Sequence, residues 1–293
     1  MQQIDIDKRV YDLYDEYCHG YIDRREFLGR ASAISVAGVS GLVMARALMP
    51  RYAEAQMVSF TDERIKANYV EYDSPGGTSG EMRGYLVQPT GDGPFPSVVV
   101  IHENRGLNPY IEDVARRLAV EGFLALAPDG LYPVGGYPGN DDDGRELQSG
   151  LDQGQLRADM LNSARYLKSH ELSSGQLGAV GFCWGGGVTN FLAVEMGSDL
   201  SAGVPFYGAA PASDDVPRIE APLMIQSAED DPRINAMWPD FEAALKQHGK
   251  QYGHHLYPGT RHGFHNNSTP RYNEEAAHLP WERTIAFFRE NLA

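Results

Sequence analysis

The stretch Gly181–Gly185, Gly-Phe-Cys-Trp-Gly, places a cysteine between two glycines in the pattern Gly-x-Cys-x-Gly. An apolar run at 177–180 precedes it, and a helix-like run at 187–194 follows it. A strand that turns sharply into a helix needs small residues on both sides of the turn, and the turn lifts the middle side chain above the sheet. The pattern predicts that Cys183 is a nucleophile, although a buried cysteine in a glycine-rich turn is the simpler alternative.

Two further residues follow in the order that completes a catalytic triad. Asp231 comes after the apolar run 222–226, and His262 comes after the run 252–257. The carboxyl ends of parallel strands meet at one edge of a sheet, so we expect the three side chains to lie together. A histidine takes or shares the thiol proton, and a carboxylate fixes the histidine tautomer. Asp230 is the rival for the acid, but we expect it to cap the turn.

Predicted strands and helices alternate along the chain. Edge strands are expected at 68–72 and 82–87, and buried strands at 97–101, 123–128 and 202–207. Helices are expected at 111–121, 156–168, 241–248 and 274–291, and a polar loop at 137–144 is expected at the rim of the site. This alternation predicts an α/β-hydrolase fold, a mostly parallel central sheet with helices on both faces, in a single domain at 56–293.

Four motifs in sequence resemble the dienelactone hydrolase family, whose namesake is carboxymethylenebutenolidase. They lie at 101–108, 181–187, 231–235 and 262–265, and the resemblance runs from about Tyr69 to the C-terminus. It implies a hydrolase that cleaves a small ester or lactone without a cofactor. It also implies that Glu103 holds the thiol uncharged at rest and accepts its proton when substrate arrives. The backbone amides of Trp184 and Asn104 are the matching candidates for an oxyanion hole.

The substrate pocket is harder to predict than the triad. The family's lactone carries a carboxylate, which arginine binds best because its planar fork matches the two oxygens. The tentative substrate-binding residues are Arg105, Tyr132 and Arg271, with Arg157 and Arg261 as further arginines and Trp184, Phe206 and Tyr207 as aromatic candidates. The namesake enzymes have an arginine a few residues beyond the catalytic histidine, whereas this chain has His265.

That departure keeps several functions open. A general small carboxylester or thioester hydrolase is the nearest alternative to a lactonase. A protein that binds ligands without turnover would keep the fold but would not need all three triad residues. A thiol redox sensor would need only Cys183, so that its function would survive the loss of His262.

The N-terminus resembles an export signal. Residues 24–28, Arg-Arg-Glu-Phe-Leu, match the twin-arginine pattern, and Ala53-Glu54-Ala55 offers a cleavage site. We therefore expect residues 1–55 to form an N-terminal extension that the twin-arginine translocation machinery reads and a peptidase removes after Ala55. The protein would then be periplasmic or extracellular in a bacterium. The uncharged run at 31–45 has 15 residues, fewer than the ~20 that span a bilayer, and an uncleaved tether is the alternative.

Composition excludes several classes of partner. The net charge of −15 disfavours nucleic acid and anionic membranes, both of which attract basic surfaces. The chain has two cysteines, and a chain cleaved after Ala55 would keep only Cys183, so no internal disulfide is expected. Neither Cys-x-x-Cys nor His-Glu-x-x-His occurs, so we expect no metal and no cofactor. The expected ligand is a small molecule.

Overall fold

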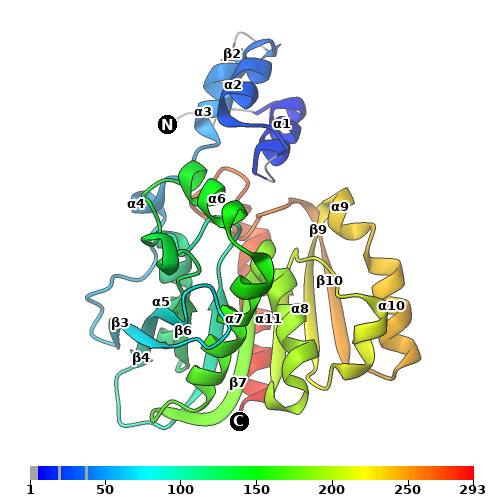
Figure 1. Ribbon diagram of the computed structural model, residues 1–293. Helices are drawn as coiled ribbons and strands as arrows, with labels where there is room; N and C mark the ends of the chain where they lie inside the picture. The colour runs from blue at the N-terminus through cyan, green and yellow to red at the C-terminus, as the bar shows by residue number, and fades with distance from the viewer. Residues whose placement is uncertain (1–5, 19–20, 37–38) are drawn as a thin grey trace.

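The computed structural model describes residues 6–18, 21–36 and 39–293 (Figure 1). The remaining residues, which belong to the predicted export signal, lie outside the described residues. An eight-stranded sheet has the order β10-β9-β8-β7-β5-β6-β4-β3. Strand β4 is antiparallel to both of its neighbours, β6 and β3, and all other neighbouring pairs are parallel. Its strands are β3 (Ile65–Asp73), β4 (Glu81–Pro89), β5 (Phe95–Ile101), β6 (Leu124–Pro128), β7 (Ser173–Phe182), β8 (Ala202–Phe206), β9 (Leu223–Asp230) and β10 (Tyr252–Arg261). The predicted α/β-hydrolase fold is confirmed.

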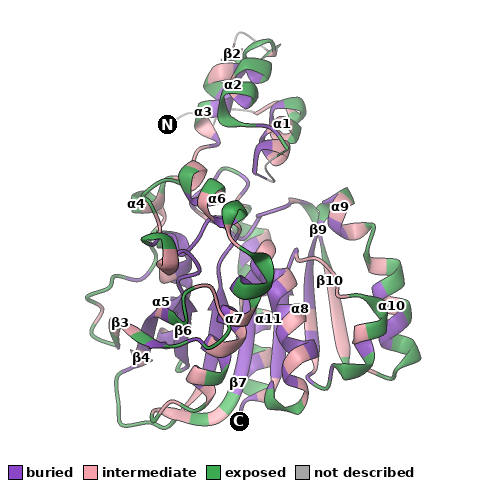
Figure 2. Cartoon of the chain, in the orientation of Figure 1, coloured by how far each residue is buried: buried purple, intermediate pink, exposed green. Residues whose placement is uncertain are grey.

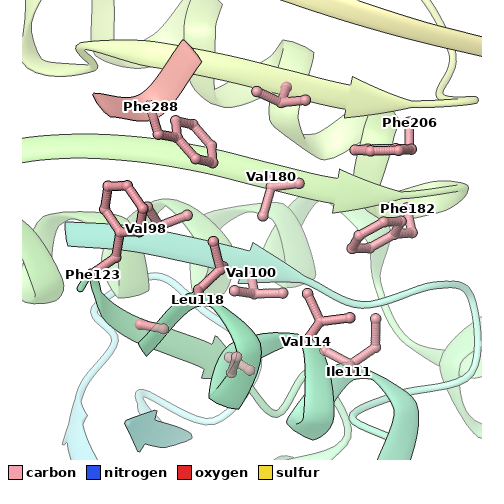
Figure 3. Close-up of a cluster of buried hydrophobic side chains, with 14 of the residues drawn as sticks. Val98, Val100, Ile111, Val114, Leu118, Phe123, Val180, Phe182, Phe206 and Phe288 are labelled. Carbon is pink, nitrogen blue, oxygen red and sulfur yellow. The ribbon is translucent and has the colours of Figure 1, made fainter. Parts of the chain in front are cut away.

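Side chains of the central strands alternate between two buried clusters. Val98 and Val100 of β5 point into one cluster, and Val99 and Ile101 point into the other, as the period of two in a strand requires. Figure 3 shows the first cluster, where β5 and β7 meet α5 and α11. Helices α7, α8 and α10 contribute to the second cluster. The helices are α5 (Pro109–Val120), α7 (Gln153–Lys168), α8 (Trp184–Met196), α10 (Trp238–Gln247) and α11 (Glu274–Asn291). Figure 2 shows the resulting layers, with buried strands behind helices whose outer faces are exposed.

One segment differs from the prediction for a local reason. The polar loop expected at 137–144 is wrong from Asp141 onward, because helix α6 (Asp141–Gly150) begins there. The Asn140 side chain accepts a hydrogen bond from the Asp143 amide and so caps the helix. The first turn also carries three aspartates, which interact favourably with the positive end of the helix dipole. These residues are a helix start, and not only a polar turn.

Residues 6–48 fold into a small unit of their own, called here the N-terminal unit. It contains α1 (Lys8–Cys18), α2 (Arg24–Ser32), the short strands β1 (Ser35–Val36) and β2 (Val39–Ser40), and α3 (Gly41–Ala47). Its core includes Tyr14 and Phe27, each at most 1% exposed, and the Tyr17 ring stacks on Phe27. Figure 1 shows this unit in blue, beyond the end of the sheet where the parallel strands finish. The rest of the chain, residues 56–293, is called the sheet domain.

The segment that connects the N-terminal unit to the sheet domain, residues 49–55, is hydrogen-bonded to the sheet domain. The Arg51 amide donates to the Ser268 carbonyl at 2.7 Å, and Asn267 Nδ2 donates to the Ala55 carbonyl at 2.7 Å. Between them, the Tyr52 hydroxyl of α4 (Tyr52–Ala55) donates to a carboxylate oxygen of α6. The predicted cleavage site is therefore packed on the sheet domain. Among the described residues, no helix combines the length and the apolar character that crossing a bilayer requires.

Candidate active site

Cys183 occupies a strained turn between β7 and α8. Its φ of 57° lies in the left-handed region, which side chains other than glycine rarely adopt. The turn fits only because its neighbours lack side chains. A Cβ at Gly181 would lie 2.0 Å from the Gly185 carbonyl oxygen, and one at Gly185 would lie 2.3 Å from the Ile101 carbonyl oxygen. The glycines in the sequence pattern are therefore steric requirements of this turn, and Cys183 itself is only half-buried.

The structure brings His262 and Asp231 to the same place. His262 follows β10 and Asp231 follows β9, which are neighbouring parallel strands. His262 Nδ1 donates to Asp231 Oδ2 at 2.6 Å, and both side chains are buried. Burial alone would lower the pKa of His262, but the Cys183 thiolate and the hydrogen bonds with Asp231 and Cys183 raise it to about 9. The imidazole is thus set up to hold a proton beside the sulfur.

Asp231 and Asp230 have separate partners. Asp231 Oδ1 also accepts from the Ile234 amide and so caps α9 (Pro232–Asn235). Asp230 pairs with Arg261 at 2.9 Å and with Lys8 of the N-terminal unit at 3.7 Å. Of the two adjacent carboxylates, Asp231 is the one bonded to the histidine.

Glu103 lies in a buried polar group near the cysteine. Its side chain accepts a hydrogen bond from Asn266 Nδ2 at 3.1 Å, and the Arg105 guanidinium lies 3.9 Å away. Burial raises the pKa of the Glu103 carboxyl, Arg105 and Arg271 oppose that shift, and Cys183 adds to it. A carboxyl with a raised pKa binds a proton more readily than a solvated one, which suits a group that exchanges a proton with a thiol.

The two candidate oxyanion donors are held by contacts that sequence reasoning did not include. The Trp184 ring stacks on His102 at 5.4 Å, and His102 Nδ1 donates to the Glu103 carbonyl at 2.6 Å. His102 Nε2 accepts from the Gly130 amide, which fixes the tautomer, and burial lowers the pKa of this histidine. Asn104 Nδ2 donates to the Cys18 carbonyl of the N-terminal unit at 2.9 Å. His102 lies in the first family motif, but its role could not be predicted from the sequence because it depends on which ring lies beside it.

A cavity of about 460 Å³ opens beside the sulfur and is called here the Cys183 cavity. Asn104 and Trp184 line it together with apolar residues of α8 and of the segment after β8, among them Phe191 and Pro211. Its cations are Arg157 and Arg233, and its acids are Glu195 and Asp215. Arg157 is among the arginines expected near the site, whereas Arg233 lies in the family motif at 231–235 and was not a candidate for substrate binding.

The three tentative substrate residues lie elsewhere. Tyr132 is in a short turn after β6, where its hydroxyl donates to Glu71 and its ring lies under the Arg83 guanidinium. Arg105 is buried and pairs with Asp141 at 2.8 Å. Arg271 is buried beneath the N-terminal unit, with its guanidinium over the Tyr14 ring. Arg261 pairs with two aspartates and likewise does not line the Cys183 cavity.

The aromatic candidates divide in the same way. Trp184 lines the Cys183 cavity, whereas Phe206 and Tyr207 are at most 1% exposed. Tyr207 has a φ of 37°, and its ring centre lies 4.9 Å from that of His262. The Tyr207 ring therefore packs against the histidine and does not line the Cys183 cavity. His265 is also buried, bonded to Tyr110 at 2.6 Å. Burial, with a smaller contribution from Arg117, lowers the pKa of His265 to about 3, so it is neutral and supplies no cation.

Over residues 6–18, 21–36 and 39–293, no group of three or more His, Cys, Asp or Glu side chains is arranged to hold an ion.

Comparison with known sequences gives two family matches. The profile of the "Dienelactone hydrolase family" matches residues 82–292, and a profile described as "YqhI-like" matches residues 1–37. A "putative hydrolase fragment YghX" of Escherichia coli is 61% identical over 115 residues, covering 39% of this chain and 97% of the relative. A "putative carboxymethylenebutenolidase" of Saccharolobus solfataricus is 32% identical, covering 74% of this chain and 96% of the relative. A "probable 2-oxo-3-(5-oxofuran-2-ylidene)propanoate lactonase" of Bradyrhizobium is also 32% identical, with coverages of 74% and 92%.

Solved structures give the same picture. A crystal structure described as a "putative dienelactone hydrolase" of Klebsiella pneumoniae matches with a TM-score of 0.66 at 28% identity, covering 76% of this chain and 99% of that one. A dienelactone hydrolase-like promiscuous phosphotriesterase, P91, from metagenomic libraries matches with a TM-score of 0.66 at 25% identity, covering 78% and 100%. Both are matched over nearly their whole length by about three quarters of this chain.

Proposed function

Since the chain belongs to the dienelactone hydrolase family and is a carboxylic ester hydrolase of that kind, we propose that it cleaves a small ester or lactone with Cys183 as the nucleophile. The observation that carries the proposal is the Asp231–His262 hydrogen bond beside a cysteine on a strained turn. A histidine whose tautomer is fixed by a carboxylate can serve first as acid and then as base.

The proposed reaction has two halves. The Cys183 thiolate attacks the carbonyl carbon, and the amides of Trp184 and Asn104 bind the resulting oxyanion. The carbon–oxygen bond to the leaving group then breaks as His262 donates its proton, which leaves a thioester on Cys183. Water, deprotonated by His262, hydrolyses this thioester and regenerates the thiolate. Glu103 takes up the thiol proton that must leave before the first attack.

The charge of the cavity favours a neutral ester over a lactone that carries a carboxylate. Arg105 and Arg271 face carboxylates or aromatic rings away from the Cys183 cavity, and His265 is neutral. The two arginines that do line it, Arg157 and Arg233, are matched there by Glu195 and Asp215. A carboxylate would therefore meet no net positive charge in this cavity.

The first test is hydrolysis by the purified full chain, with 4-nitrophenyl acetate and a dienelactone as parallel substrates. Cys183→Ala should abolish turnover of every substrate that the wild type accepts, while Cys18→Ala, which removes the other thiol, should keep turnover of the small ester. Turnover of the ester that greatly exceeds that of the lactone supports the neutral substrate. Turnover that survives Cys183→Ala refutes the nucleophile. A ligand-binding or redox function instead predicts that His262→Ala has little effect.

We propose separately that the chain is exported by the twin-arginine machinery. The support is the Arg24-Arg25-Glu26-Phe27-Leu28 sequence, whose two arginines are exposed in the first turn of α2. Replacing both arginines with lysine should leave the protein in the cytoplasm, as detected by fractionation of a bacterial host. Arg46→Lys, an exposed arginine of the same unit, is the matched control. Equal export of both variants would contradict the proposal.

A further inference from the structure

A second cavity adjoins the Cys183 cavity and is called here the outer cavity. Its volume is about 790 Å³, and the N-terminal unit lines it through residues 22–25. Helix α6 and the start of α7 supply further lining residues, including Gln148, Ser149 and Gln153. Asn104 and Trp184 line both cavities. The two cavities therefore meet at the residues whose amides are the candidate oxyanion donors.

The N-terminal unit docks on the loops that carry the active site. Arg261, directly before His262, pairs with Asp12 at 3.2 Å and lies over the Tyr11 ring at 4.9 Å. The Asn104 side chain, directly after Glu103, donates to the Cys18 carbonyl of α1. These contacts involve residues 11–18 of α1 and dock this helix against the loops that carry Glu103 and His262.

A second set of contacts ties the N-terminal unit to α6 across the outer cavity. Arg24 pairs with Asp142 at 3.1 Å, and Arg145 pairs with the same carboxylate at 3.2 Å. The Arg145 guanidinium also lies 4.3 Å from the centre of the Tyr17 ring. The outer cavity thus lies between two parts of the chain that are joined by ion pairs.

The two cavities differ in chemistry. Most residues that line the Cys183 cavity are apolar, whereas most residues that line the outer cavity have charged or amide side chains, whose carbon atoms still supply much of its exposed surface. The charges of the outer cavity balance, with arginines and acids in equal number: Arg24, Arg25, Arg145, Asp23, Asp142 and Glu146. A wall that both donates and accepts hydrogen bonds without net charge suits a neutral, hydroxyl-rich group.

We propose that the N-terminal unit is part of the substrate-binding site, and that the outer cavity binds the polar, polyhydroxylated alcohol of an ester. The apolar acyl group of that ester lies in the Cys183 cavity. The proposal rests on the proposed function, because it places the scissile carbonyl at the amides of Asn104 and Trp184. It requires that residues 1–55 stay attached, as in the uncleaved alternative, and it assigns the N-terminal unit a role in substrate selection that is separate from any role in export.

The kinetic test compares two butyrate esters that share an acyl group, ethyl butyrate and glucose 6-butyrate, with acid release followed for both. Ser149→Trp fills the outer cavity from α6, and Arg25→Ala removes a hydrogen-bond donor from the N-terminal unit. Each should lower kcat/KM for glucose 6-butyrate by about tenfold while changing kcat/KM for ethyl butyrate by less than about twofold. Arg46→Ala removes the same charge from an exposed position outside both cavities and should change neither value.

A binding measurement separates this proposal from the proposed function. Cys183→Ala protein is titrated with each ester by calorimetry, which requires no turnover. We expect glucose 6-butyrate to bind more tightly than ethyl butyrate, and the difference to disappear when Ser149→Trp or Arg25→Ala is added. Equal binding of the two esters, or a difference that survives both additions, overturns the role of the outer cavity. Turnover that does not need Cys183 refutes the nucleophile alone, and the binding result still decides the outer cavity.

Discussion

The sheet domain and the N-terminal unit are stabilised on different scales. The sheet domain buries apolar side chains in two clusters, one on each face of an eight-stranded sheet. The N-terminal unit has one small cluster built around the rings of Tyr14, Tyr17 and Phe27. Units of about 40 residues rarely bury enough surface to fold alone. The turn that carries Cys183 is therefore held by a large core, whereas the part of the outer cavity wall that the N-terminal unit supplies depends on docking between the two parts.

Two adjacent carboxylates give the strongest test of this difference. Asp231 bonds the histidine of the site, whereas Asp230 pairs with Arg261 and with Lys8 of the N-terminal unit. Asp231→Asn should lower kcat by about a thousandfold or more, because the histidine loses the partner that fixes its tautomer. Asp230→Asn should change turnover of ethyl butyrate by less than about threefold, because an exposed ion pair contributes little. Similar losses in the two variants would contradict the assignment of the acid.

Replacement of a glycine by alanine should have opposite effects on stability in the two parts. Gly181→Ala should destabilise the protein by about 3 kcal/mol or more, because the added Cβ would lie 2.0 Å from a backbone oxygen. Gly29 of α2 has no atom within 4 Å of the same position, so Gly29→Ala should stabilise its helix by up to about 1 kcal/mol. Urea denaturation measures the first change, and amide exchange of α2 measures the second. A tolerated Gly181→Ala would show that the turn can relax.

Two buried phenylalanines test whether the parts unfold separately. Phe288 in the sheet domain and Phe27 in the N-terminal unit are both fully buried. Truncation of either to alanine should cost about 3 kcal/mol locally. Phe288→Ala should lower the stability of the whole sheet domain, whereas Phe27→Ala should raise amide exchange only in residues 6–48. Unfolding of both parts together in the Phe27→Ala variant would show that they form one cooperative unit.

The pKa of His262 tests whether the Cys183 sulfur interacts with the imidazole. Its pKa is raised to about 9 in the folded protein, above the ordinary value of 6.5. The resulting stabilisation is fully present below pH of about 6.5 and is lost as the pH rises through about 9. Cys183→Ala removes the thiolate, so nuclear magnetic resonance should find a lower pKa for His262 in that variant. An unchanged pKa would show that the thiolate does not interact with the imidazole.

The sharp turn at Cys183 and the proximity of Asp231 and His262 could be predicted because their causes are local. Gly181 and Gly185 are required by steric contacts within a few residues of the turn, and a strand end places Asp231 and His262 at a known edge of the sheet. Which arginines line the Cys183 cavity could not be predicted in this way. Arg105 and Arg233 look alike in a sequence, and only the packed structure shows that Arg233 faces the Cys183 cavity.

Two helices that the sequence analysis does not predict have a local signal in the sequence. The apolar residues of α1, Val10, Tyr14, Tyr17 and Cys18, have the spacing of a buried helix face. Likewise, the Asn140–Asp143 segment has the composition of a capped helix start, which favours helix α6 over the expected polar loop.

The hydrogen bonds that hold residues 51–55 on the sheet domain lower the affinity that the N-terminal unit needs in order to stay docked there. The unit ends at about Leu48, and the Arg51 amide is already bonded to the sheet domain. Such a short tether keeps the unit at an effective local concentration in the millimolar range or above. Contacts that are individually weak, such as exposed ion pairs, are then sufficient to keep the N-terminal unit docked at the outer cavity in the intact chain. The same unit supplied as a separate peptide would need a comparable millimolar concentration to occupy its place.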